Sequence, residues 1–539
     1  MRSPVCLALF LLLGVPVRAG DLVINEVLSA NHATVQGLKG SPDWLELYNA
    51  APGPRDVGGM RITLGLLRYD LPMGTRIAGK GHLLIPFGAE DQGASFGLPR
   101  EGATLLLVDA DGTTVLDVFS YPRLSSGISF GRSPDGASSW SYFREPTPGA
   151  PSPPQAPVQG VAKRPAPSMP GGNYPDPVSV AFHPPPGHQV HYTTDGSTPV
   201  AGTAQVYTAP LRIAENTVLR MITTGPGLLQ SPVHMAVYTI GSAPKGPVVH
   251  LGLDPVDLLG DSTGIDVEGA FANHTRTGRD WERDAQVLLP WTGTSVPLEV
   301  GVRVTGNGSR GRPKRSFKLL LKDRFGSPQD VFRDGPAKGT DECMLRADAS
   351  PGAYLQNTFM EAVAGGQTLA LDVQASIPVQ LFINGEDRGL YRAMAPKDVQ
   401  WITATRKVEA VDLLDGPALK ALSGGRRGLL DGLEALLTGA PLDSLERWFD
   451  VASLIDLACM EVYTGRADHD LNVRCWRERS ASGRWRWILY DQDLWPSAAE
   501  NSVARMCSSE LPEAPFLKEI LRHPELRDRR HRVRDLLLR

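Results

Sequence analysis

A proline-rich stretch divides this 539-residue chain into candidate domains. It reads "REPTPGAPSPPQAPVQGVAKRPAPSMPGG" and spans residues 144–172. Proline fixes φ and has no backbone N–H to donate, so such a stretch forms neither a helix nor a central strand and acts as a stiff linker. A shorter break, "GSAPKGP", spans residues 241–247. We therefore predict three folded parts, at residues 20–152, 169–240 and 247–539, with a proline-rich linker at residues 153–168.

The first residues predict export. The apolar run "VCLALFLLLGV" lies between Arg2 and the small residue Ala19. This run is too short to span a membrane, and its layout is typical of a cleavable secretory signal peptide at residues 1–19. No later stretch approaches about 18 apolar residues, so we expect no transmembrane segment. The sequence thus predicts a secreted or cell-surface protein.

Charge and cysteine content exclude two classes of partner. A net charge of -4 and a pI near 6.3 argue against binding to nucleic acid. Four cysteines lie outside the signal peptide, and an exported protein can oxidise them in any of three pairings: Cys343, Cys459, Cys475 and Cys507. Cys459 and Cys475 flank an acidic loop that a disulfide between them would staple. Because no C-x-x-C motif occurs and no histidine stands at ligand spacing, we do not expect a zinc site.

The first two parts have the pattern of small all-β sandwiches, because short strand-like runs alternate with Gly, Pro and Asp-Gly turns. In the first part, "SPDWLELYNA" alternates apolar and polar residues, and we interpret Asp43, Glu46 and Asp111 as solvated strand and turn positions. In the second part, "VHYTTDGSTPV" predicts a strand followed by a hairpin turn at Asp195–Gly196.

Both parts resemble known modules. The segments "DLVINEVLSAN", "SPDWLELYNA" and "SFGRSPDGASSW" resemble the lamin-tail domain, an immunoglobulin-like sandwich. Residues 169–240 are similar to the C-terminal sandwich of chitobiases and β-hexosaminidases, an accessory module without catalytic residues of its own. These resemblances imply spacers, or binding modules for a cell-surface polymer or protein.

The third part mixes strand and helix patterns. "VPLEVGVRVTG" and "ASIPVQLFING" alternate as strands do, whereas "YLQNTFMEAVAG" and "VASLIDLACMEVYTG" have the period of a helix. We therefore expect an α+β domain at residues 247–539. Within it, "GDSTG" at residues 260–264 matches the nucleophile elbow G-x-S-x-G, but no helix pattern follows it, so we predict a turn.

A glycine-rich motif, "GNGSRG" at residues 306–311, fits G-x-G-x-x-G. A dinucleotide-binding fold needs a helix directly afterwards, whereas "RSFKLLLK" alternates as a strand does. The motif therefore predicts a turn between two antiparallel strands. With Lys314, Arg315 and Lys318 beside it, this turn is either a cradle for phosphates or an exposed hairpin whose charges aid solubility.

Two acidic motifs carry the clearest chemistry. In "GRADHDLNVRCW", Asp468, Asp470 and Asn472 recur at every second position, but an EF-hand would need glycine and glutamate where Val473 and Arg479 stand. An aspartate followed closely by an asparagine is instead the layout of a kinase catalytic loop. There the aspartate orients a hydroxyl and accepts its proton.

The second acidic motif is "RWRWILYDQDLW", residues 484–495. As one strand, it would place Asp491 and Asp493 on the same face as Trp485 and Trp487. Two carboxylates about 6 to 7 Å apart repel each other, so they require a positive partner, either a metal ion or basic residues. We predict a magnesium ion carried by nucleotide phosphates; the alternative is a solvated acidic strand end.

Four motifs in order resemble the CotH spore-coat kinase family of atypical, kinase-like proteins: "GVRVTGNGSRGRPKRSFKLLLK", "VQLFINGEDRGLYRA", "GRADHDLNVRCWR" and "GRWRWILYDQDLW". The resemblance runs from about residue 247 to the end. It implies two sandwiches followed by an α+β atypical protein-kinase-like domain. That domain would use ATP with Mg²⁺ or Mn²⁺ to phosphorylate Ser or Thr of an extracytoplasmic protein. Asp468 would be catalytic, and Asn472, Asp491 and Asp493 would bind the metal.

The resemblance also implies that Lys314, Arg315 and Lys318 form the basic segment that binds the nucleotide. Several positions depart from the pattern that the resemblance implies: Ala395 stands where glutamate is usual, Arg466 replaces an asparagine, His469 replaces a tryptophan, and Gln356 and Asn357 replace a charged pair. Losing a charged partner removes a few kcal/mol of transition-state stabilisation. Two functions therefore stay open, an exported kinase and an inactive kinase-like scaffold for cell-surface or coat assembly. A secreted hydrolase or carbohydrate-binding protein is a third alternative.

Overall fold

The structure is a computed structural model, and it describes most of the chain. The described residues are 20–31, 42–88, 93–125, 127–152, 158, 160–242, 244–293, 295–321, 335–349, 355–366, 369–468, 471–495, 500–508 and 517–526. The predicted signal peptide, residues 1–19, and Asp470 lie outside them.

The first part is a β-sandwich, as predicted. One sheet has the order β11-β10-β1-β2-β7, and the other has the order β5-β4-β8-β9. The strands are β1 (Leu22–Leu28), β2 (Asp43–Asn49), β4 (Arg61–Leu64), β5 (Leu67–Asp70), β7 (His82–Phe87), β8 (Gly102–Val108), β9 (Val115–Pro122), β10 (Ser129–Arg132) and β11 (Trp140–Phe143), with a short pair β3 (Arg55–Asp56) and β6 (Arg76–Ile77). Apolar residues of both sheets form one core.

Two of the three acidic residues of this sandwich are not solvated. Asp43 and Glu46 are 3% and 0% exposed, because β2 runs between β1 and β7 and is buried at every position. The outer face of β2 is covered by the end of the domain, where the Gly149 N–H donates to the Glu46 carboxylate at 2.7 Å. Asp111 is exposed, as predicted, and its carboxylate accepts from the backbone N–H groups of Thr113 and Thr114.

The second part is also all-β, with sheet order β13-β20-β18-β15-β16 and a separate β14–β17 pair. The strands are β13 (Gly172–Tyr174), β14 (Val178–Val180), β15 (Gln189–Thr193), β16 (Gln205–Val206), β17 (Leu211–Ile213), β18 (Thr217–Thr224) and β20 (His234–Ile240). The proline-rich linker, within its described residues, contains only β12 (Gly160–Val161), which pairs in parallel with β19 (Leu228–Leu229). Asp195 and Gly196 lie in the loop after β15, as predicted.

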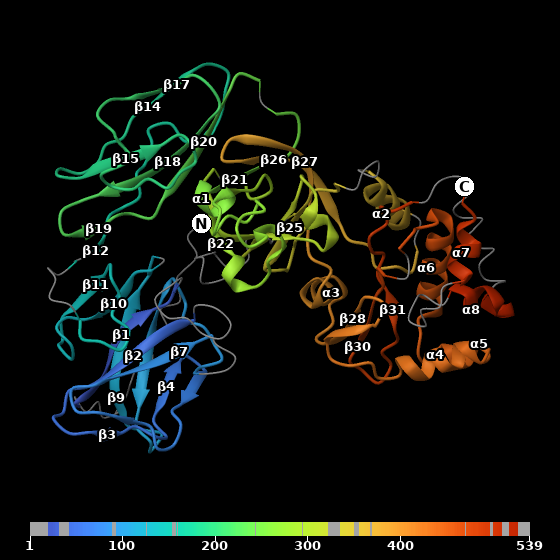
Figure 1. The fold of residues 1–539 in the computed structure, drawn as a ribbon, viewed down its shortest axis with the longest axis horizontal. Helices are drawn as coiled ribbons and strands as arrows, with labels where there is room; N and C mark the ends of the chain where they lie inside the picture. The colour runs from blue at the N-terminus through green and yellow to red at the C-terminus, as the bar shows by residue number, and fades with distance from the viewer. Residues whose placement is uncertain are drawn as a thin grey trace, which may run out of the picture.

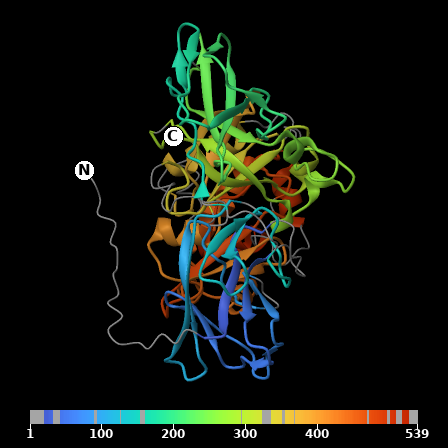
Figure 2. The same cartoon turned by 90° about the vertical axis from the view of Figure 1, so that its left-hand side faces the viewer.

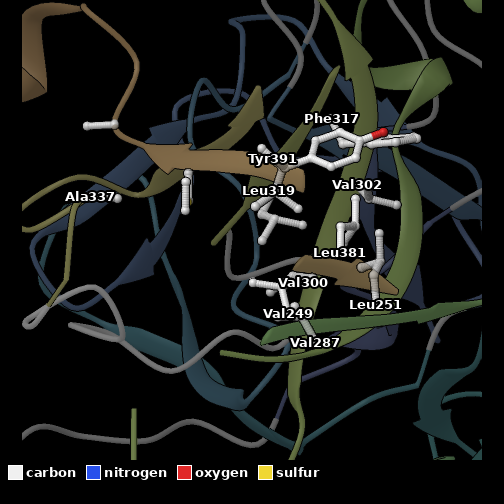
Figure 3. Packing of buried hydrophobic residues seen from close by; sticks show 14 of the residues in the cluster. Val249, Leu251, Val287, Val300, Val302, Phe317, Leu319, Ala337, Leu381 and Tyr391 are labelled. Carbon is white, nitrogen blue, oxygen red and sulfur yellow. The ribbon is translucent and has the colours of Figure 1, made fainter. Parts of the chain in front are cut away.

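The third part begins with a closed barrel of seven strands in the order β21-β22-β23-β24-β25-β27-β26. They are β21 (Val248–Leu253), β22 (Arg283–Leu288), β23 (Leu298–Thr305), β24 (Ser316–Leu320), β25 (Glu342–Arg346), β26 (Ser376–Ile383) and β27 (Glu386–Met394). Alternate residues of these strands, such as Val249, Leu251, Val300 and Val302, fill the interior (Figure 3). The predicted turn at residues 306–311 does join two antiparallel strands, β23 and β24, through the 3-10 helix η3 (Gly308–Gly311).

Helices and a small sheet complete the third part. The sheet has the order β29-β28-β30-β31, and most of the helices pack around a second hydrophobic cluster. These elements are α1 (Pro255–Leu259), α2 (Gln356–Gly366), α3 (Val399–Arg406), β28 (Val411–Asp415), β29 (Lys420–Ser423), α4 (Leu429–Leu437), α5 (Leu442–Leu445), α6 (Val451–Thr464), β30 (Arg474–Glu478), β31 (Arg486–Trp487), α7 (Ser502–Ser508) and α8 (Leu517–Arg522). The "GDSTG" motif forms a turn after α1. A barrel with helices agrees with an α+β domain, whereas a kinase-like fold stays a prediction.

The barrel lies between the two sandwiches and the helical part (Figure 1). Seen from the side, the two sandwiches lie at opposite ends of the molecule (Figure 2). The second sandwich packs its Val218, Met235 and Val237 against Leu288 of the barrel. The first sandwich is joined to the barrel by Arg123, whose guanidinium forms an ion pair with Glu299 of β23. The three parts therefore form one assembly of touching domains.

The predicted staple between Cys459 and Cys475 is not formed. Cys475 on β30 is a buried thiol outside any disulfide, and so is Cys343 of the barrel. Cys343 packs as a small apolar side chain in the barrel core, and Cys475 does so in the second hydrophobic cluster. Among the helices of the described residues, none combines the length and apolar character that crossing a membrane requires.

Candidate functional site

The segment 484–495 is not one long strand. Only Arg486–Trp487 form β31, and Asp491 has a φ of 55°, which breaks the alternation of faces. Trp485, Trp487 and Leu489 are buried, as the pattern predicted. The acidic end is therefore a loop whose carboxylates are placed by their contacts rather than by strand geometry.

The positive partner of the two aspartates is Arg346, the last residue of β25. Its Nη2 donates to Asp491 Oδ1 at 2.5 Å and to Asp493 Oδ2 at 3.1 Å. Its Nε donates to Asp348 Oδ1 at 2.6 Å. Burial disfavours the charged guanidinium, but these carboxylates outweigh burial and raise the pKa of Arg346 above its usual value. For Asp491, burial is likewise outweighed by Arg346, and its pKa is lowered.

A second arginine extends this network through the barrel wall. Arg392 of β27 lies directly opposite Arg346 in the sheet register. Its guanidinium bonds to Asp348 and, through Nη1, to Glu361 Oε2 of α2 at 2.6 Å. Asp348, Glu361 and Arg392 are all buried. A buried chain of alternating charges thus ties β25, β27 and α2 to the acidic loop.

Lys397, just after β27, also belongs to the network. Its Nζ donates to Glu361 Oε1 at 3.2 Å and to the Leu489 carbonyl at 2.7 Å. Burial lowers the pKa of Lys397, against the attraction of Glu361. Ala395 is fully buried in the barrel core. The carboxylate that contacts Lys397 therefore comes from α2, not from position 395.

Asp468 and Asn472 lie together beyond the end of α6. That helix ends at Gly465, whose φ of 61° allows the chain to turn away. Asn472 Nδ2 donates to Asp468 Oδ2, and the Asn472 N–H donates to the Asp468 carbonyl at 3.2 Å. Asp468 Oδ1 is a buried atom and has no hydrogen-bond partner within the described part of the chain. One oxygen of Asp468 is thus fixed and the other is available.

Electrostatics place Asp468 beside the acidic pair. Burial raises the pKa of Asp468 to about 6; Arg466 opposes the shift, and the charges of Asp491 and Asp493 add to it. A carboxylate with such a pKa suits a general base at neutral pH. The Ala467 N–H donates to the Leu494 carbonyl at 2.8 Å, so the two loops lie side by side, whereas the shared site of Asp468, Asn472, Asp491 and Asp493 stays a prediction.

Arg466 holds these segments in place. It is 1% exposed and forms two hydrogen bonds with Glu461, at 2.6 and 3.0 Å. Its Nη1 also donates to the carbonyls of Tyr490, at 2.7 Å, and Asp491, at 3.2 Å. The substitution of asparagine by arginine here adds a buried link between α6 and the acidic loop.

The basic segment is less well gathered than predicted. Arg315 pairs with Asp266 at 3.0 Å and Lys318 with Glu342 at 2.6 Å, so both charges are neutralised on the barrel. Lys314 donates to the Leu390 carbonyl and lies 4.5 Å from the centre of the Tyr391 ring. Burial lowers the pKa of Lys314, and the nearby charge of Asp348 opposes this. Of these three basic residues, Lys314 is the one whose charge interacts with Asp348, and Asp348 in turn accepts a hydrogen bond from Arg346 of the acidic site.

The donor atoms suit a hard cation. Carboxylate and amide oxygens are the ligands that Mg²⁺ and Mn²⁺ prefer, and Asp468 Oδ1 is a buried oxygen that contacts no donor of the residues described by the structure. As the described residues stand, no three His, Cys, Asp or Glu side chains are grouped closely enough to hold a metal ion. Arg346 takes one oxygen of Asp491 and one of Asp493. While Arg346 holds those oxygens, the described residues form no metal site, and a bound Mg²⁺ or Mn²⁺ stays a prediction.

Sequence reasoning missed Arg346, Arg392, Lys397 and Glu361. The signal that was available is a charged residue inside an otherwise apolar strand, as in "ECMLRAD" and "GLYRAMAPKD". Such charges are buried only when they are paired.

Comparisons with known proteins agree with this organisation. The family model described as CotH kinase protein matches residues 302–412 and 428–538, which include every predicted site residue. The family model described as chitobiase/beta-hexosaminidase C-terminal domain matches residues 169–235. Neither match reaches residues 20–152, so the lamin-tail resemblance stays a prediction. No curated protein matches the chain. The C-terminal part of this chain is therefore similar to the CotH kinase protein family and follows a segment similar to the chitobiase/β-hexosaminidase C-terminal domain.

Proposed function

We propose that this protein is an exported atypical kinase that transfers the γ-phosphate of ATP to Ser or Thr of extracytoplasmic proteins. The observation that carries the proposal is Asp468: a half-buried carboxylate with a pKa raised to about 6, whose Oδ1 has no hydrogen-bond partner among the described residues and which the charges of Asp491 and Asp493 influence. The match to the CotH kinase protein family over this region supports it.

Each residue of the site has a role in this reaction. Asp468 Oδ1 accepts the proton of the substrate hydroxyl. At the same time, the hydroxyl oxygen bonds to the γ-phosphorus, and the bond between the γ-phosphorus and the ADP oxygen breaks. Asn472 holds Asp468 Oδ2, so that Oδ1 keeps its direction. Asp491 and Asp493 would hold Mg²⁺ or Mn²⁺, which neutralises phosphate charge when bound. Lys314, at the barrel rim, contacts the phosphates.

The runner-up is an inactive kinase-like scaffold for cell-surface or coat assembly. Two observations favour it: Arg346 already neutralises Asp491 and Asp493, and position 395 carries no carboxylate. In either case, the two sandwiches would present the C-terminal domain to a cell-surface polymer or protein.

A transfer assay tests the proposal. The protein is incubated with γ-labelled ATP, Mg²⁺ or Mn²⁺ and a generic acceptor protein, alongside Asp468→Asn and Asp491→Ala. We expect label on the acceptor with the natural protein and a loss of at least about 100-fold in both variants. Asp111→Asn, at an exposed turn of the first sandwich, is the matched control and should keep full activity. Nucleotide binding without transfer would favour the scaffold.

A further inference from the structure

The guanidinium of Arg346 stands where a cation shared by Asp491 and Asp493 would stand. A single nitrogen, Nη2, lies 2.5 Å from an oxygen of one aspartate and 3.1 Å from an oxygen of the other. The three side chains are 22%, 27% and 9% exposed, so water screens these contacts only partly. The repulsion between the two carboxylates is therefore already relieved by the chain itself.

We propose that Arg346 is the built-in counter-cation of this acidic pair and keeps the pair closed to divalent metals until the guanidinium withdraws. As a regulatory device the proposal rests on the proposed function, because it takes the pair to be the metal site. A metal ion bound between the same oxygens would lie beside the guanidinium and be repelled by it. The two cations therefore compete for one position.

The backbone around Arg346 has the features of a switch. Two of its three carboxylate partners, Asp348 and Asp491, have left-handed φ values of 44° and 55°. Such conformations are strained for residues other than glycine, and they persist where surrounding contacts hold them. Asp348 also accepts hydrogen bonds from Arg392, so it stays in place when Nη2 of Arg346 breaks its bonds to Asp491 and Asp493. Arg346 can thus leave the acidic pair while keeping its Nε bond to Asp348.

Nucleotide phosphate gives the guanidinium another anion to bind. Arginine pairs well with phosphate oxygens, so ATP would draw Arg346 away and open the pair. Without nucleotide, Arg346 has withdrawn in only a small fraction of the molecules, and only those molecules bind the metal. The apparent metal affinity is therefore lowered in proportion to that fraction. Metal and nucleotide should bind with positive cooperativity, each favouring the open arrangement.

The test uses Mn²⁺ alone, followed by the electron paramagnetic resonance signal of the free ion, with the full chain. We expect Arg346→Gln to bind Mn²⁺ at least about tenfold more tightly than the natural protein. Arg406→Gln is the matched control, because it also removes a guanidinium from a buried aspartate, Asp372. It should leave Mn²⁺ binding unchanged. Adding ATP should tighten Mn²⁺ binding in the natural protein more than in Arg346→Gln.

Equal Mn²⁺ affinity in the natural protein and Arg346→Gln would overturn the proposal. If Arg346→Gln does not fold, Arg346→Met replaces it: it also removes the positive charge, so its Mn²⁺ affinity should exceed the natural one, and an unchanged affinity overturns the proposal equally. Adding Asp491→Asn to either variant should abolish the gain. The two proposals can fail separately. If Arg346→Gln binds Mn²⁺ tightly but the natural protein transfers no phosphate, the role proposed for Arg346 stands and the proposed kinase activity is wrong.

Discussion

At the residue scale, sequence reasoning singled out the candidate acidic residues but not the residue that neutralises them. Asp468 and Asn472 stand four residues apart, and Asp491 and Asp493 two apart, so spacing alone singled them out. Arg346 stands 145 residues before Asp491 and is one of many arginines. Only closure of the barrel brings it to the acidic loop, and no local pattern encodes that contact. The requirement for a positive partner was predictable from charge repulsion, but its identity was not.

The raised pKa of Asp468 predicts a pH profile. A general base works only when deprotonated, and burial moves the pKa of this carboxyl to about 6. We expect the transfer rate to fall about tenfold per pH unit below pH 6 and to level off above it. Rates measured from pH 4.5 to 8 test this. A profile that stays flat through pH 6 would mean that Asp468 is not the base, whereas the residual rate of Asp468→Asn should lack this inflection.

Lys397 offers a second test at this scale. Its ammonium is buried between Glu361 and the Leu489 carbonyl, so removing its charge leaves a buried glutamate short of one partner. We expect Lys397→Met to lower the free energy of unfolding by about 3 kcal/mol. Denaturant unfolding gives the value. Lys420→Met, at an exposed strand position, is the control and should change the free energy by less than about 0.5 kcal/mol. A loss no larger than that of the control would show that the pair is not stabilising.

At the element scale, patterns predicted which segments are strands and helices better than where they end. The alternation in "DWLELYN" predicted a strand, and β2 is one, but it wrongly predicted a solvated face. Alternation cannot reveal that a distant segment, here residues 147–152, covers that face. Similarly, "RWRWILYDQDLW" is apolar enough for a strand, but hydrogen bonds to Arg466 pull its acidic end into a loop.

Burial of β2 predicts a pH-dependent stability. Burial raises the pKa of Glu46 to about 8, although Asn25 and the Gly149 N–H act against it. Its folded pKa lies above its unfolded value of about 4.5, so its contribution is fully present below pH 4.5 and is lost as pH rises through about 8. We expect the first sandwich to lose up to about 1.4 kcal/mol per pH unit across this window.

Calorimetry of the full chain at pH 5, 7 and 9 measures this loss. The transition that moves to lower temperature with rising pH should move clearly less in Glu46→Gln, because an amide does not ionise; a smaller movement remains from Glu26, whose pKa burial also raises. The pKa of Asp111 is lowered by its bonds to Thr114, so Asp111 is already ionised at pH 5 and Asp111→Asn should leave the pH dependence intact. A Glu46→Gln protein with the natural pH dependence would contradict the assignment.

At the scale of the whole molecule, composition breaks predicted domain boundaries, but they gave no indication of docking. The proline-rich linker predicted separate domains, and its described part is indeed almost without secondary structure. Proline content says nothing of partners, however, and Glu299 on β23 accepts from both Arg123 of the first sandwich and Arg164 of the linker. Such contacts depend on surfaces that only the folded domains create.

Glu299 therefore controls how firmly the first sandwich is held. Glu299→Gln removes a carboxylate that neutralises two arginines at a largely buried position, so we expect the docked arrangement to lose about 1 to 3 kcal/mol. Cleavage by a protease within residues 153–168 should become faster, and small-angle scattering should show a larger radius of gyration. Glu386→Gln, which removes an exposed partner of Arg388, is the control and should behave as the natural protein does. If Glu299→Gln left both measurements unchanged, the β12–β19 pairing would have to hold the sandwich without help from this carboxylate.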